Sequence, residues 1–194
     1  AFIEAVQNDP ETSELHFALG NLFRRRGDYE RAVRVHEHLL QRGDLGQKDL
    51  QRAQHALAQD FLKAGLLDRA EAALRKLEDS PYATEALLAL LSIYERSRDW
   101  EHAAETAVRL ETIGCGSFEL RQAHYRCEQA DLLRKQGSTV EALAMLEALV
   151  QRSPKSARAW ISLADLRQSL GDTQGALQAL HQLAAQVPQH LPLV

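Results

Sequence analysis

A six-residue turn segment recurs five times along this chain, and each copy ends in alanine. The copies begin 38, 33, 39 and 34 residues apart, and their last residues are Ala32, Ala70, Ala103, Ala142 and Ala176. An invariant methyl group at one position indicates a place where two helices approach closely. A period of this length is typical of repeat arrays, in which each unit buries the apolar face of its neighbour. The repeat therefore constrains the fold more than any other feature of the sequence.

The composition between the turns favours helices. The 194 residues include only 10 Gly and 5 Pro, so helix-breaking residues are scarce. Apolar residues recur at helical spacing, as in Leu143, Leu146, Leu149 and Val150. Two amphipathic helices per unit follow. We predict an all-α protein, a tetratricopeptide-repeat right-handed superhelical solenoid of antiparallel helix pairs.

The repeat register divides residues 1–194 into a single array. We expect residues 1–12 to end a truncated repeat, residues 191–194 to start another, and five full repeats to occupy 13–50, 51–83, 84–122, 123–156 and 157–190. Neither end carries a polar cap, so we expect a segment of a longer array whose uncapped ends could self-associate. The long spacings near Gly43 and Gly114 predict an extended helix or connection; the alternative is a partner contact projecting from one rim.

Charge and motifs exclude several functions. The formal net charge of −4 argues against nucleic-acid binding, and neither a membrane span nor a signal peptide is found, so the chain as given is expected to be soluble. Cys115 and Cys127 fit no redox or zinc spacing, and His36 and His38 are interpreted as surface residues. We predict no enzyme, no cofactor and no metal site. An unfamiliar active site at His124 and Cys127 is the alternative, with Cys127 as a small packing residue the preferred interpretation.

A protein-binding groove is predicted from the repeat register. In this architecture the second, fifth, ninth, twelfth and thirteenth positions of the first helices line the concave surface. The predicted groove residues are Phe17, Asn21, Arg24, Arg25, Arg52, His55, Gln59, Lys63 and Arg96. The same positions in the last two units hold Cys127, Asp131, Arg134, Arg158, Asp165 and Ser169, among others. The basic stretch in the first two units could bind an acidic peptide or could be the solvated ends of helices.

Several stretches go beyond the generic repeat pattern. They are HFALGNLFRRRGDYERAVRVHEHLL (16–40), DFLKAGLLDRAEAALRKL (60–77), SIYERSRDWEHAAETAVRL (92–110) and AHYRCEQADLLRKQG (123–137). Together with the long spacings near Gly43 and Gly114, they resemble the lipopolysaccharide assembly protein B family of Gram-negative bacteria over essentially the whole chain.

The resemblance implies a function. Proteins of that family have an N-terminal inner-membrane helix, a cytoplasmic repeat array and a C-terminal rubredoxin-like zinc module. They regulate lipid A synthesis by helping a membrane-bound AAA protease to degrade the deacetylase that commits precursors to the pathway. The 194 residues hold neither the membrane helix nor the four zinc cysteines. We therefore expect the scaffold part of such an adaptor, at the cytoplasmic face of the inner membrane; the alternative is a scaffold for another envelope or secretion assembly.

Overall fold

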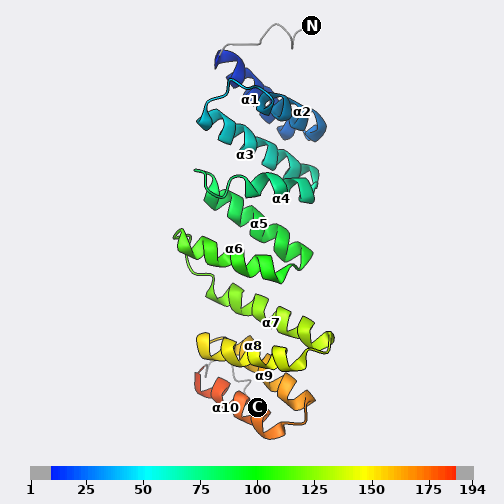
Figure 1. Cartoon of the computed structure of the whole chain (residues 1–194), viewed down its shortest axis with the longest axis vertical. Helices are drawn as coiled ribbons and strands as arrows, with labels where there is room; N and C mark the ends of the chain where they lie inside the picture. Colours follow the sequence, from blue (N-terminus) through cyan, green and yellow to red (C-terminus); the bar gives the residue numbers. More distant parts are fainter. Residues whose placement is uncertain (1–9, 187–194) are drawn as a thin grey trace. The chain divides into compact units, whose positions relative to one another are not determined.

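The computed structural model describes residues 10–186, which form ten α-helices and no strand (Figure 1). The helices alternate as first and second members of antiparallel pairs. Their bounds are α1 (Pro10–Arg25), α2 (Tyr29–Leu40), α3 (Gln47–Ala64), α4 (Leu67–Arg75), α5 (Ala83–Ser97), α6 (Trp100–Thr112), α7 (Glu119–Lys135), α8 (Thr139–Arg152), α9 (Ala157–Ser169) and α10 (Thr173–Gln186). The predicted all-α repeat fold is confirmed.

Local sequence signals set the tight turns inside each pair. Asp28 and Asp99 accept hydrogen bonds from the backbone N–H groups of Arg31 and His102, and so cap α2 and α6. The recurrent alanines lie in the second helices of the pairs and are all buried, at 0% exposure for Ala32, Ala70, Ala103 and Ala142 and 6% for Ala176. A larger side chain at these five positions would force the paired helices apart.

The helices form two compact units, which divide between Ile93 and Tyr94. In the first unit α1, α2, α3 and α4 pack in chain order, and Phe17, Leu39 and Ala53 belong to its core. In the second unit α6 to α10 pack in the same way, around a core that includes Leu146, Trp160 and Leu163. Each unit thus buries the apolar faces of its helix pairs against their neighbours.

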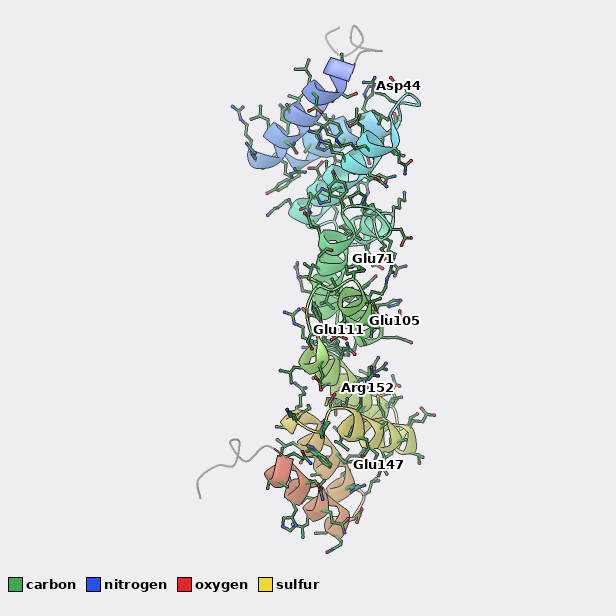
Figure 2. The ribbon with its side chains drawn as sticks, turned by 90° about the vertical axis from the view of Figure 1, so that its left-hand side faces the viewer. Asp44, Glu71, Glu105, Glu111, Glu147 and Arg152 are labelled. Carbon is green, nitrogen blue, oxygen red and sulfur yellow. The ribbon has the colours of Figure 1, made fainter. Side chains whose placement is uncertain are left out.

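The two long spacings are accounted for by connections and extended first helices. Residues 41–46 connect α2 to α3, which has 18 residues, and residues 113–118 connect α6 to α7, which has 17. Glu111, labelled in Figure 2, holds the second connection by accepting hydrogen bonds from the Phe118 backbone N–H and from Gln122 Nε2, the latter at 2.8 Å. The prediction of an extended helix or connection is confirmed.

The beginning of the first repeat differs from the prediction. Helix α1 already includes residues 10–12, which the register placed at the end of a preceding repeat. Residues 10–12 therefore belong to the first described helix, not to a preceding repeat. Residues 1–9 and 187–194 lie outside the described part of the chain, together with the predicted truncated repeat at the C-terminal end.

Candidate functional site

The predicted groove residues of the first unit lie on α1 and α3, and Arg24 links the two helices. Its Nη1 donates to Asp60 Oδ1 and to the Ala56 carbonyl oxygen of α3, both at 2.9 Å. Its Nη2 donates to Asn21 Oδ1. The Asp60 side chain is fully buried and that of Arg24 is 22% exposed. Arg24 is therefore mainly a structural cation, which corrects its assignment to a free groove surface.

The buried carboxylate of Asp60 has a second partner in α2. His36 Nδ1 donates to Asp60 Oδ2 at 2.5 Å, and both side chains are 0% exposed. The His36 ring packs on Gly20, where an added Cβ would lie 2.4 Å from His36 Nε2. The interpretation of His36 as a surface residue was wrong: the ring is buried, and Gly20, which has no side chain, leaves room for it.

Arg52 of α3 is held against α1 in two ways. Its guanidinium forms an ion pair with Glu14 and lies over the Phe17 ring, 4.0 Å from the ring centroid. The hydrogen bond from Arg52 lowers the pKa of Glu14. Phe17 itself is 1% exposed, which corrects its placement on an accessible groove: at the fifth position of the first repeat, the ring is covered by Arg52 and the core.

His55 of α3 is a third basic residue of the predicted groove that lies close to a carboxylate. Its ring stacks on Tyr82 with centroids 4.3 Å apart, and its Nε2 lies 2.8 Å from Glu85 Oε2, at ion-pairing distance but without hydrogen-bond geometry. Three of the five predicted basic groups, those of Arg24, Arg52 and His55, therefore face carboxylates within the unit. Among the described residues, no carboxylate pairs with the exposed side chains of Arg25 and Lys63.

The remaining predicted residues stay accessible to a partner. Asn21 and Gln59 are half-buried in α1 and α3, and Arg96 is exposed in the last turn of α5. Asn21 is oriented by Arg24, since its Oδ1 accepts from that guanidinium. Its amide nitrogen is then left to donate to another group. Binding at these positions stays a prediction.

The second unit has a hollow of about 300 Å³ between α7 and α9. It brings together six positions of the predicted groove, Cys127, Asp131, Arg134, Arg158, Asp165 and Ser169. Most of its charges are paired: Arg158 with Glu128, and Asp131 with Arg134 and Lys135. Hydrogen bonds from Lys135 and Arg134 lower the pKa of Asp131. Such a polar, internally neutralised hollow suits an extended polypeptide that supplies its own hydrogen bonds.

Cys127 at the base of this hollow is 3% exposed. Burial raises the pKa of its thiol, so the reactive thiolate is disfavoured. His124 packs edge-on against Trp100, with the ring centroids 5.5 Å apart. These contacts favour the packing interpretation of Cys127 over a nucleophile.

Within residues 10–186, no three or more His, Cys, Asp or Glu side chains lie together in a group that could hold a metal ion. In the same range no helix combines the length and apolarity needed to cross a membrane.

Sequence reasoning missed the pair of His36 and Asp60, although the repeat register contains a signal for it. Asp60 is at the tenth position of its unit, where the other four units have Leu or Ile. His36 is at the twenty-fourth position, where the others have Leu or Ala. Two polar exceptions in otherwise aliphatic positions of adjacent helices indicate a buried polar pair.

Comparison with known proteins places the chain among repeat proteins. Profiles of the tetratricopeptide repeat match residues 15–51, 55–114 and 133–194. Lipopolysaccharide assembly protein B of Escherichia coli K12 is 31% identical over 186 residues, which is 95% of this chain and 48% of that protein. The protein of the same name from Haemophilus influenzae Rd is 32% identical over 191 residues, 96% of this chain and 48% of that protein. The resemblance stated from the sequence is confirmed.

The chain spans about half the length of these two relatives. Among solved structures, a crystal structure of MamA protein aligns with a TM-score of 0.46 and 18% identity, over 96% of this chain and all of that one.

Proposed function

Because this chain belongs to the tetratricopeptide-repeat family, we propose that it is a non-catalytic scaffold that binds other proteins through its first helices and acts in lipopolysaccharide assembly. The observation that carries the proposal is the 31% identity to lipopolysaccharide assembly protein B over 95% of the chain. The polar surface of α1 with α3 and the polar hollow between α7 and α9 support a binding role. They offer paired charges and free hydrogen-bonding groups rather than an activated nucleophile.

In the finer form of the proposal, the scaffold presents the deacetylase that commits precursors to lipid A to a membrane-bound AAA protease. An adaptor of this kind raises the local concentration of a substrate at the protease and needs no chemistry of its own. The membrane anchor and the rubredoxin-like zinc module that the family resemblance implies would lie outside these 194 residues. They would place the scaffold at the cytoplasmic face of the inner membrane.

The unpaired cations Arg25 and Lys63 are the sharpest test of the groove. Each occupies the thirteenth position of its unit, at the end of α1 or α3, and each is exposed. In the full-length protein, we expect the double variant Arg25→Glu and Lys63→Glu to reduce co-purification of the deacetylase or the protease about tenfold, because a surface of one sign that meets an acidic partner would be reversed.

The matched control is the double variant Lys76→Glu and Lys155→Glu. These two exposed lysines lie outside the first helices, and their reversal changes the net charge by the same amount. The control should bind like the parent protein. Equal losses in both double variants would show a general charge effect, and undiminished binding in the first variant would refute the groove assignment.

A further inference from the structure

One helix end in the array departs from the rule that the other four obey. In each turn between the two helices of a pair, a residue one or two positions after the first helix has a positive φ, with values of 78°, 74°, 89° and 81° at Gly27, Gly65, Gly137 and Gly171. In the third repeat this position holds Arg98, at a φ of 59°. Arg98 is the one non-glycine residue with positive φ in the described part of the chain. A side chain in the left-handed region is strained. Such strain is a reason to look for a function nearby.

Arg98 lines a hollow of about 410 Å³ in the second of the two compact units. Its apolar lining comes from three helices, with Trp100 in the first turn of α6, Leu132 and Leu133 near the end of α7, and Met145 in α8. The polar residues around it are Arg98, Asp99, Glu101, Arg126, Gln129 and Gln136. The volume is enough for one large side chain of a partner.

The hollow exists because α7 is incompletely covered. The seventh and tenth positions of the fifth repeat, in α9, are Leu163 and Leu166, which are 1% and 3% exposed. The same positions of the fourth repeat, in α7, hold Gln129, which is half-buried, and Leu132, which is 51% exposed. The apolar surface that α5 and α9 bury at these positions, with Leu90 and Ile93 of α5 at 1% and 6% exposure, is thus left open in α7, as it also is at Leu19 and Leu22 of α1.

Four charged side chains line the hollow: the guanidinium groups of Arg98 and Arg126 and the carboxylates of Asp99 and Glu101. Asp99 is committed to the start of α6, since it accepts from the His102 backbone N–H at 3.3 Å and from His102 Nδ1 at 2.7 Å. Arg126 donates to the neutral Gln129 at 3.0 Å. Within residues 10–186, neither Arg126 nor Arg98 has a carboxylate at ion-pairing distance. Two guanidinium groups that form no ion pair therefore flank an open apolar surface, together with one carboxylate, that of Glu101, which is not committed to a helix start.

We propose that this hollow is a docking pocket for a partner polypeptide that presents a large apolar side chain next to a carboxylate. The apolar side chain packs on Trp100, Leu132 and Met145, and the carboxylate pairs with Arg98 and Arg126. The strained Arg98 fits this role, because glycine at this position would relieve the backbone but remove the cation. The site is separate from the groove of α7 and α9 and does not depend on the function proposed above.

The two tryptophans of the chain make the proposal measurable. Trp100 lines the hollow, whereas Trp160 donates its Nε1–H to the Pro154 carbonyl oxygen at 2.8 Å. In ¹⁵N-labelled full chain, the acetylated and amidated peptide Leu-Phe-Glu-Glu should shift the Trp100 indole signal saturably, with a Kd on the order of 1 mM, and leave Trp160 unchanged. Leu-Phe-Gln-Gln should bind about fivefold more weakly, and Ser-Ser-Glu-Glu should not bind.

Three variants complete the test. Arg98→Gly should weaken the acidic peptide about fivefold without loss of thermal stability, and Leu132→Glu should abolish binding. Leu170→Glu replaces a leucine of similar exposure, 52%, outside the hollow, and should bind normally. No Trp100 shift, equal shifts of both tryptophans, or unchanged affinity in Arg98→Gly would overturn the proposal. So would a dimer of the unliganded chain that Leu132→Glu dissociates, because the occupant would then be a second copy.

Discussion

Replacing the buried pair His36 and Asp60 by leucine, singly and together, tests whether the pair acts as a coupled unit. Leucine is the natural choice, because Leu74 and Leu166 occupy the same repeat positions in other units. The Asp60 carboxylate accepts from Arg24 at 2.9 Å and from His36 at 2.5 Å. Each single variant removes one partner from a buried polar contact, whereas the double variant leaves only Arg24, which has access to solvent.

The expected free energies of unfolding follow from exposure. Asp60→Leu strips His36 of its acceptor inside the core, and we expect a loss of about 3 kcal/mol, the low end for breaking a buried pair, because Arg24 is 22% exposed and can be rehydrated. His36→Leu leaves Asp60 still paired with Arg24, so the loss should be about 2 kcal/mol. The double variant should lose only about 1 kcal/mol, because two leucines restore an apolar contact.

Urea unfolding followed by far-ultraviolet circular dichroism measures all four proteins. The single losses exceed the loss of the double variant, which gives a coupling free energy of roughly 4 kcal/mol, well above the 0.5 kcal/mol or less of independent sites. Leu15→Ala, at an α1 leucine that is 64% exposed, controls for general loss of apolar surface. If the double variant lost the sum of the single losses, the coupled network would be refuted.

Three further predictions concern backbone and burial. Gly20→Ala should lower the free energy of unfolding by about 2 kcal/mol, measured in urea, because its Cβ would lie 2.4 Å from His36 Nε2. Arg98→Gly should raise the free energy of unfolding by about 1 kcal/mol, because glycine tolerates the φ of 59°; lower stability in this variant would contradict the assignment of strain. The pKa of Cys127 is raised by burial, so its contribution is fully present below the ordinary thiol pKa of about 8.5 and is lost as the pH rises through the folded-state value. Unfolding at alkaline pH should therefore show a weaker pH dependence in Cys127→Ala, and an unchanged dependence would exclude this thiol as a cause.

The repeat register predicts the helix pairs well, because the formation of each pair depends on local sequence and on packing against the neighbouring helices. The alanines at the twentieth position, such as Ala103 and Ala142, are buried, since only a small side chain allows the close approach of two helices. The pattern of first and second helices follows from this one position together with the turn before it.

The same register predicts the site less well, because it gives the face of a helix that a residue occupies but not its partners. Arg24 occupies a groove position, yet its guanidinium turns to Asp60, a residue 36 positions later. Phe17 occupies another, yet Arg52 covers its ring.

The hollow beside Trp100 is a further feature that the sequence does not predict. The replacement of glycine by Arg98 is visible in the sequence, but the hollow beside it depends on how the start of α6, the end of α7 and Met145 of α8 pack together.

The half-life of the lipid A deacetylase in Gram-negative cells is the most direct test of the proposed adaptor. It is measured after protein synthesis is stopped, in cells that contain the full-length protein and in cells that lack it. The adaptor function predicts rapid loss of the deacetylase when the protein is present and a half-life several times longer when it is absent or carries Glu at Arg25 and Lys63. An equal half-life in all of these cells would contradict the proposed function.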